Sequence, residues 1–326
     1  MNLPDTGLIP ERRSPFSDNV PGFQTALDST SLGLFKECPK KYYYQMILGY
    51  QPKSLSVHLK FGLLYHYGLE VYDHARAEGK DKDTAVRDMV RAALEKSGER
   101  KDGVWFPWQS TDAFKNLWTL IRSLVWYVDY FQHSILRTVI LANGKPAVEL
   151  SFNFEAFELN GEVILLCGHM DRLVERSDQN NSGQAWVGDR KTTKNQLNDQ
   201  FYRSFTPHNQ FTLYSVAGKV VLNRAVEGVM VDAAQVATGF TRFGQRPVPR
   251  PAAVLDEWMR DTQLIVGQMY SCAVNQHWPM NDKSCGNYGG CAFAKVCGVA
   301  PSFRKAWLEA DFAKWEWNPL STRGDV

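Results

Sequence analysis

The spacing of apolar residues changes from a helical period to strand alternation after the first third of the chain. Residues 57–79 carry apolar side chains three and four positions apart and end in glycine, which predicts an amphipathic helix. Residues 83–98 and 112–142 show similar spacing and predict two more helices. In residues 29–48 we expect a helix that is broken at Pro39, because proline cannot donate the helical hydrogen bond. The first third of the chain is therefore expected to be mainly helical.

Strand patterns follow this helical part. Apolar and polar side chains alternate in residues 147–159, and Asn160-Gly161 predicts a tight hairpin turn into a second strand at 162–175. The middle of that second strand is almost wholly apolar, as expected of a strand covered on both faces. The remaining expected elements are strands at 185–193 and 227–237, a helix beginning at Thr206-Pro207, a proline-rich loop at 241–250 and an amphipathic helix at 251–276.

Together these elements predict an α/β fold in which helices surround a small mixed sheet. A flexible N-terminal extension of residues 1–28 is expected to precede one domain, residues 29–310, and a tail of residues 311–326. Within the domain we expect a helical part at 29–143, a core at 144–240 and a C-terminal helix with a cysteine-rich region at 251–300.

Composition narrows the class of protein. The 326 residues are 44% hydrophobic and 22% charged, which is typical of a globular protein, and the formal charge of +2 requires any contact with nucleic acid to come from local patches. No apolar run reaches the roughly 20 residues of a membrane helix, and the N-terminus lacks the apolar segment of a secretory signal. A cytoplasmic protein, from a bacterium or a phage-infected cell, is therefore expected.

The segment "VGDRKTTK", residues 187–194, carries candidate chemistry at the end of a strand. Residues two apart in a strand face the same side, so Asp189 and Lys191 project together. The loop at 176–184 allows the two flanking strands to pair antiparallel, which brings Asp171 close to Asp189. An ordinary surface ion pair is one interpretation. The other is phosphodiester hydrolysis, in which carboxylates bind divalent cations and a lysine serves the attacking water.

The ordered set of motifs resembles the catalytic core of the PD-(D/E)XK nucleases, in particular their RecB-like branch. Gly168-x-x-Asp171 followed by Asp189-x-Lys191 carries the resemblance. His66 on an upstream helix, Glu149 on the first core strand, and Gln210 and Tyr214 four apart on the next helix match further positions of that branch. The resemblance implies that His66, Glu149, Asp171 and Asp189 bind Mg²⁺ or Mn²⁺, that Lys191 serves the water, and that Gln210 and Tyr214 contact DNA or brace Lys191.

Four of the six cysteines extend the resemblance. AddB-type and CRISPR-associated RecB-like exonucleases carry one cysteine before the core and three after it, and these four hold a 4Fe–4S cluster. Here the corresponding residues are Cys38, Cys285, Cys291 and Cys297. Five residues separate Cys285 from Cys291, where the family usually has two, which makes Cys285 the least certain ligand. Structural zinc and four buried free thiols stay open as alternatives, whereas Cys167 and Cys272 are assigned to the core.

The resemblance implies an exonuclease that degrades DNA from its ends in recombination, repair or replication, beside a separate helicase or recombinase. Basic residues near the motifs, Arg172, Arg190, Lys194 and Arg203, are candidates for contact with phosphates. Two other functions stay open: a structure-specific or CRISPR-adaptation endonuclease, and a DNA-binding module that keeps the fold without activity.

Overall fold

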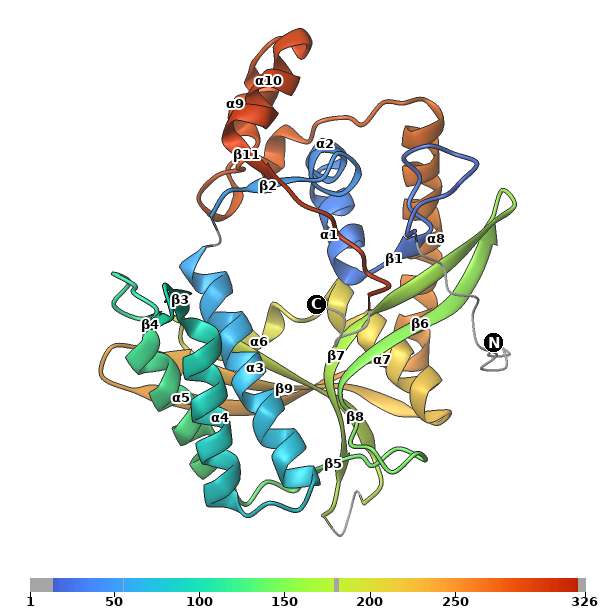
Figure 1. Ribbon diagram of the computed structural model, residues 1–326. Helices are drawn as coiled ribbons and strands as arrows, with labels where there is room; N and C mark the ends of the chain where they lie inside the picture. Colours follow the sequence, from blue (N-terminus) through green and yellow to red (C-terminus); the bar gives the residue numbers. More distant parts are fainter. Residues whose placement is uncertain (1–13, 55, 179–181, 322–326) are drawn as a thin grey trace. The chain divides into compact units, whose positions relative to one another are not determined.

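The computed structural model describes residues 14–54, 56–178 and 182–321, which form two compact units (Figure 1). The first unit comprises the described residues up to 54, residues 151–168 and those from 252 onward. The second unit comprises the described residues of 55–150 and 169–251. Two long strands, β6 (Val148–Leu159) and β7 (Glu162–Arg176), run through both units. Asn160 and Gly161 between these strands both have positive φ, as the predicted hairpin turn requires.

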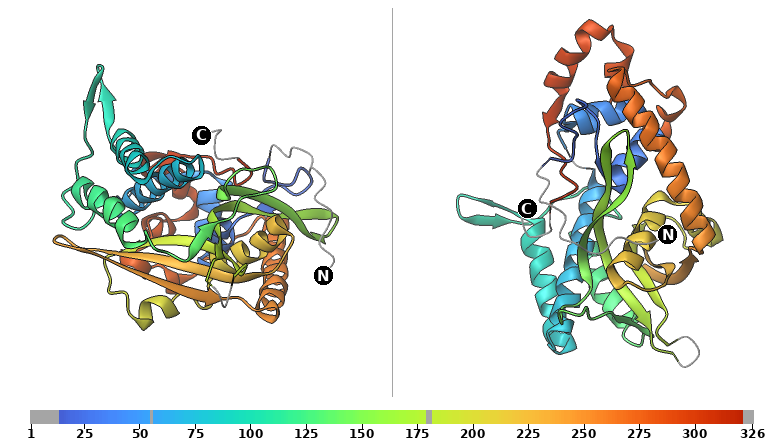
Figure 2. Two further views of the ribbon diagram at one scale, coloured as in Figure 1. Left: turned by 90° about the horizontal axis from the view of Figure 1, so that it is seen from below. Right: turned by 90° about the vertical axis from the view of Figure 1, so that its right-hand side faces the viewer.

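Three helices of the second unit pack on one another: α3 (Val57–Ala77), α4 (Lys82–Ser97) and α5 (Leu117–Tyr130). Their shared core contains the stripe that the sequence predicts on α3, with Phe61, Tyr65 and Leu69 fully buried. A polar side chain caps each helix at its N-terminus, Ser56, Asp81 and Asn116 respectively. A short hairpin of β3 (Glu99–Lys101) and β4 (Val104–Phe106) extends away from α4, as both views of Figure 2 show.

The sheet of the second unit is mixed. β7 pairs antiparallel with β8 (Ala185–Thr193), β8 pairs parallel with β9 (Val226–Val236), and β9 pairs antiparallel with β10 (Thr241–Pro249). β5 (Leu136–Thr138) joins the other side of β7. The connection from β8 to β9 contains α6 (Asp199–Arg203) and α7 (Asn209–Leu222). A mixed sheet flanked by helices confirms the predicted fold class.

Two expectations for this unit are wrong. The segment 112–142 contains only the helix α5, because Asn116 caps its start and the chain turns after Tyr130 to enter β5. The proline-rich segment 241–250 is not a loop but contains the strand β10. Prolines 247 and 249 are tolerated there because β10 is the last strand in the order of the sheet, and an edge strand can lack backbone donors.

The first unit combines N-terminal and C-terminal segments. The chain breaks as expected between α1 (Ser29–Glu37) and α2 (Pro39–Tyr42), because Cys38 is extended and Pro39 starts the second helix. A π-helical turn, Tyr43–Ile47, continues α2. The remaining elements are β1 (Ala26–Leu27), β2 (Tyr50–Pro52), α8 (Ala252–Val274), the 3₁₀ turns Asp282–Ser284 and Asn287–Gly289, α9 (Ala294–Gly298), α10 (Pro301–Asp311) and β11 (Phe312–Lys314).

The described part of the expected N-terminal extension, residues 14–28, is folded into the first unit. Phe23 is fully buried, and β1 pairs in parallel with β7 at Leu165 and Leu166. Residues 1–13 lie outside the described part of the chain. No helix among the described residues is long and apolar enough to span a membrane.

Candidate active site

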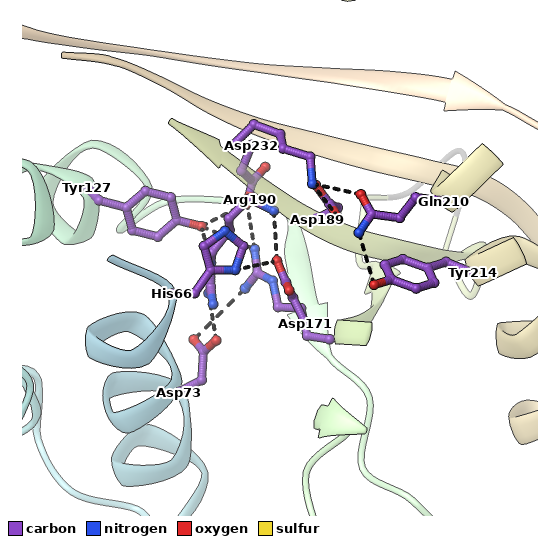
Figure 3. A network of polar contacts seen from close by, with 11 residues as sticks. His66, Asp73, Tyr127, Asp171, Asp189, Arg190, Gln210, Tyr214 and Asp232 are labelled. Atoms are coloured by element: carbon purple, nitrogen blue, oxygen red, sulfur yellow. Dashed lines mark hydrogen bonds and ion pairs between the residues drawn. The ribbon is translucent and has the colours of Figure 1, made fainter. Parts of the chain in front are cut away.

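The strand β8 carries the acid and the lysine on one face. Lys191 Nζ lies 2.7 Å from Asp189 Oδ2 and donates a hydrogen bond to Gln210 Oε1 at 3.0 Å. Gln210 in turn donates from Nε2 to the Tyr214 hydroxyl at 3.1 Å (Figure 3). Gln210 and Tyr214 are one turn apart on α7, so their side chains lie on the same helix face. The structure therefore places the two α7 residues beside Lys191, where they fix the position of its ammonium group.

Asp171 on β7 lies beside this pair because β7 and β8 are antiparallel, with Arg172 opposite Gly188. The backbone N–H of Arg190 donates to Asp171 Oδ2 at 2.9 Å. The same carboxylate oxygen lies 3.1 Å from His66 Nδ1 on α3 (Figure 3). The predicted pairing of the two strands is thus present. In addition, α3 places His66 against Asp171.

Glu149 completes a group of three. One ligand atom from each of His66, Glu149 and Asp171 lies within 4.8 Å of the others. Glu149 is buried near the start of β6 and has a φ of 48°, a left-handed conformation that non-glycine residues rarely adopt. Strained backbone of this kind costs about 1–3 kcal/mol and is found mostly at functional sites. The alternation pattern of β6 gave no sign that this side chain is buried.

The pKa values of Asp189 and Asp171 are shifted in opposite directions. Burial raises the pKa of Asp189 to about 6, since the ion pair with Lys191 offsets only part of the burial and the neighbouring charge of Asp171 raises the pKa further. Burial also acts on Asp171, but its contacts with His66, together with Lys191 and the Arg190 N–H, outweigh it and hold the pKa of Asp171 well below its usual value. Two buried carboxylates side by side repel each other, so a bound cation would stabilise the ionised pair.

The donor set fits a divalent cation. Carboxylate oxygens suit Mg²⁺ and Mn²⁺, and an imidazole nitrogen makes the set more favourable to Mn²⁺. The group of His66, Glu149 and Asp171 lies within one unit and comes from three elements, α3, β6 and β7. Asp189 contacts Lys191 rather than belonging to this group, although its charge interacts with both Asp171 and His66.

Two residues expected to contact DNA instead form ion pairs within the fold. Arg190 is 1% exposed, and its guanidinium donates to Asp73 Oδ2 at 2.6 Å and to the Tyr127 hydroxyl at 3.3 Å. Arg172 forms an ion pair with Asp232 at 2.7 Å. Since these guanidinium groups already have partners inside the fold, the expected phosphate contacts of Arg172 and Arg190 are corrected to internal ion pairs. Lys194 and Arg203 are exposed, as a contact with DNA requires.

Asp73, Tyr127 and Asp232 were not among the residues singled out by sequence. Asp73 lies seven residues after His66 on α3, which places both on one face of the helix, and this spacing was the available signal. Tyr127 and Asp232 sit in apolar stretches of α5 and β9, where nothing in the local pattern marks them.

The four predicted cluster cysteines all belong to the first unit. The Asn281 N–H donates to Cys38 Sγ at 3.4 Å, and the Cys285 thiol contacts the Asn281 carbonyl at 3.8 Å. Cys285 interacts electrostatically with Cys291 and Cys38, and so does Cys297. Among the described residues these cysteines do not form a group close enough to share a single ion.

A family model described as the PD-(D/E)XK nuclease superfamily matches residues 29–298. No curated protein matches the sequence. Among solved structures, a "putative exonuclease" from Eubacterium rectale is 12% identical, with 84% of this chain and 94% of that chain covered and a TM-score of 0.44. The protein SSO0001 is 10% identical, with 74% and 77% covered and a TM-score of 0.30.

Proposed function

Because the chain belongs to the PD-(D/E)XK nuclease superfamily, we propose that it is a Mg²⁺- or Mn²⁺-dependent deoxyribonuclease of the RecB-like branch that degrades DNA from its ends. The main support for the proposal is that one ligand atom from each of His66, Glu149 and Asp171 lies within 4.8 Å of the others, beside the Asp189–Lys191 pair. Recombination, repair or replication are the processes that such an enzyme serves, with a separate helicase or recombinase as partner.

The metal site in this proposal consists of His66, Glu149, Asp171 and Asp189. A divalent cation held there supplies Lewis-acid activation of the phosphate and stabilises the leaving oxygen. The protein contributes a buried, partly preorganised set of oxygens. The Arg190 N–H and His66 both contact Asp171 Oδ2, which keeps that carboxylate ionised and oriented.

Lys191 is proposed to position the attacking water and to stabilise negative charge as it develops. Its ammonium is held between Asp189 and Gln210, and Tyr214 in turn hydrogen-bonds Gln210. A lysine oriented from two sides loses little further entropy when it engages a water or a phosphate oxygen. The role of Gln210 and Tyr214 in this account is to orient Lys191, and Lys194 and Arg203 are the exposed cations left to contact the DNA backbone.

The choice between an exonuclease and an endonuclease is tested with matched DNA substrates. Covalently closed circular DNA and the same DNA linearised are incubated with the protein and Mn²⁺. Degradation of the linear form alone supports an exonuclease. Nicking or cutting of the closed circle identifies a structure-specific endonuclease instead. Asp129→Asn, at an exposed aspartate of α5, serves as a variant that keeps full activity.

We further propose that Cys38, Cys285, Cys291 and Cys297 hold a 4Fe–4S cluster. In such a cluster each thiolate binds a different iron, and the four cysteines belong to one unit, where Cys285 and Cys297 each interact electrostatically with Cys38 and Cys291. The Asn281 N–H donates to Cys38 Sγ, and the Tyr44 side chain hydrogen-bonds Cys297. Burial raises the pKa of the Cys285 and Cys297 thiols, so cluster binding would have to displace their protons. The interactions linking Cys285 to Cys38 and Cys291 support it as the fourth ligand.

The role proposed for the cluster is structural. It would link Cys38 near the start of the first unit to the segment 285–297 near its end, and closing so long a loop restricts the unfolded chain. Anaerobically purified protein is therefore expected to be brown and to contain about four iron atoms per chain, with Cys38→Ser losing both iron and thermal stability. A colourless protein with one zinc ion per chain would overturn the cluster proposal without affecting the nuclease site.

A further inference from the structure

A buried polar network lies on the opposite side of β8 from the proposed catalytic pair. Asp189 and Lys191 project from one face of the strand, and Arg190 between them projects from the other. Its guanidinium reaches Asp73 on α3 and Tyr127 on α5 (Figure 3). The Tyr127 hydroxyl donates to Asp232 Oδ2 at 2.7 Å, and Gln245 Nε2 donates to Asp232 Oδ1 at 2.6 Å. The network therefore joins two helices to the central strands of the second unit.

Arg190 connects this network to the site through its own backbone. The guanidinium of Arg190 binds Asp73, and the backbone N–H of Arg190 donates to Asp171 Oδ2 at 2.9 Å. A side chain that is 1% exposed and held by two partners has little freedom. Its backbone amide is consequently fixed in direction, and so is the carboxylate oxygen that accepts from it.

Asp73 also connects the network to His66 through α3. The two residues are seven positions apart, which is about two turns or roughly 10 Å along the helix, and they lie on one face. Asp73 Oδ2 is 2.6 Å from Arg190 Nη2, and His66 Nδ1 is 3.1 Å from Asp171 Oδ2. Besides its apolar packing, α3 thus makes two polar contacts with the sheet: Asp73 with Arg190, and His66 with Asp171 in the site. A shift or rotation of α3 that broke the first contact would displace His66 from Asp171.

We infer that Asp73 is a positioning residue for the metal site and acts through Arg190 and His66. Its ion pair with Arg190 sets the height and rotation of α3 on the sheet, so that the imidazole of His66 meets the carboxylate of Asp171. Asp73 itself contacts neither metal nor substrate in this account. The inference rests on the proposed function only in taking His66 and Asp171 as ligands of one ion. Partners beyond the ligands typically change metal affinity by 10–100-fold when they are removed.

The test measures Mn²⁺ binding directly, without DNA. Titration of metal-free protein is followed by the electron paramagnetic resonance signal of free Mn²⁺, for the wild type, Asp73→Asn, His66→Ala and the double variant. Asp73→Asn is expected to weaken Mn²⁺ binding about 10-fold. In the His66→Ala background the same substitution is expected to weaken Mn²⁺ binding less, because only the route through Arg190 and Asp171 remains. Equal weakening in both backgrounds would overturn the inference.

A control separates positioning from general loss of stability. Asp28 is a buried aspartate of the first unit that caps α1 through Ser31, so Asp28→Ala removes a comparably buried carboxylate together with the helix cap. It is expected to lower the melting temperature while leaving Mn²⁺ affinity unchanged. A fall in affinity as large as that of Asp73→Asn would mean that the metal site simply follows overall stability, and would overturn the inference.

Tyr127→Phe is the second variant if Asp73→Asn does not fold. It removes one hydroxyl, which contacts Arg190, Arg172 and Asp232, and it leaves the Asp73–Arg190 ion pair in place. A smaller weakening of Mn²⁺ binding is expected in both backgrounds, because Arg190 still orients Asp171 when His66 is absent. Unchanged Mn²⁺ binding would overturn the inference. If the wild-type protein binds no Mn²⁺, the proposed function itself is overturned. This result differs from failure of the inference alone, in which the wild type binds Mn²⁺ and the variants do not behave as expected.

Discussion

Asp189→Asn is expected to stabilise the metal-free protein at neutral and alkaline pH while abolishing cleavage. The structure buries Asp189 beside Asp171, and burial raises its pKa from 3.8 to about 6. A raised pKa means that the folded state binds the proton more tightly than the unfolded state does. The stabilisation from this proton is complete below pH 3.8 and is lost as the pH rises through about 6.

The magnitude follows from the two pKa values. A change from 3.8 to about 6 corresponds to a destabilisation on the order of 3 kcal/mol at pH 8, most of which is absent at pH 4. Asparagine mimics the protonated carboxyl and can still accept the hydrogen bond that Lys191 donates at 3.0 Å. The variant is therefore expected to melt several degrees above the wild type at pH 8, by roughly 5 °C.

The assay is thermal unfolding in EDTA at a series of pH values from 4 to 8, with activity measured separately in Mn²⁺. Asp199→Asn, at an exposed aspartate of α6, controls for the loss of a carboxylate as such. The difference in melting temperature between the Asp189→Asn variant and the wild type should shrink steadily as the pH falls. A variant that is equally stable or less stable than the wild type at pH 8 would refute the electrostatic account of this site.

Other predictions concern neighbouring residues. Lys191→Met is expected to lower kcat about 100-fold or more with Mn²⁺ binding retained, measured by single-turnover cleavage; an unchanged kcat would remove the lysine from the mechanism. Gln210→Ala should lower kcat less, because it only orients Lys191. Glu149→Gly should relieve about 1 kcal/mol of backbone strain at φ 48°, raise thermal stability in EDTA and weaken Mn²⁺ binding; a loss of stability would contradict the strain argument. Lys194→Ala is expected to weaken DNA binding and reduce its salt dependence, seen as a shallower slope in a salt titration.

Much of the fold and part of the site were predictable because they depend on local patterns. Alternation in β6, the Asn160-Gly161 turn and the apolar middle of β7 are local signals, and each describes the observed element. The meeting of Asp171 with the Asp189–Lys191 pair followed from one short antiparallel connection. These features require knowledge only of neighbouring segments.

What could not be predicted depends on the tertiary arrangement. The side chains of Arg172 and Arg190 resemble surface cations in the sequence. Only the approach of α3 and β9 supplies the carboxylates of Asp73 and Asp232 that pair with them. Glu149 is buried and its backbone adopts a left-handed conformation, and no periodicity in the sequence indicates either feature. β10 escapes prediction because its prolines are tolerated only at the edge of the sheet.

The most direct test of the central claim is cleavage of end-labelled linear DNA by the purified protein in Mn²⁺, compared with Asp189→Ala and with the wild type in EDTA. Labelled nucleotides are expected to be released by the wild type in Mn²⁺ and by neither of the other two samples. Cleavage that persists in Asp189→Ala, or that proceeds equally well in EDTA, would contradict a metal-dependent nuclease site built on β7 and β8.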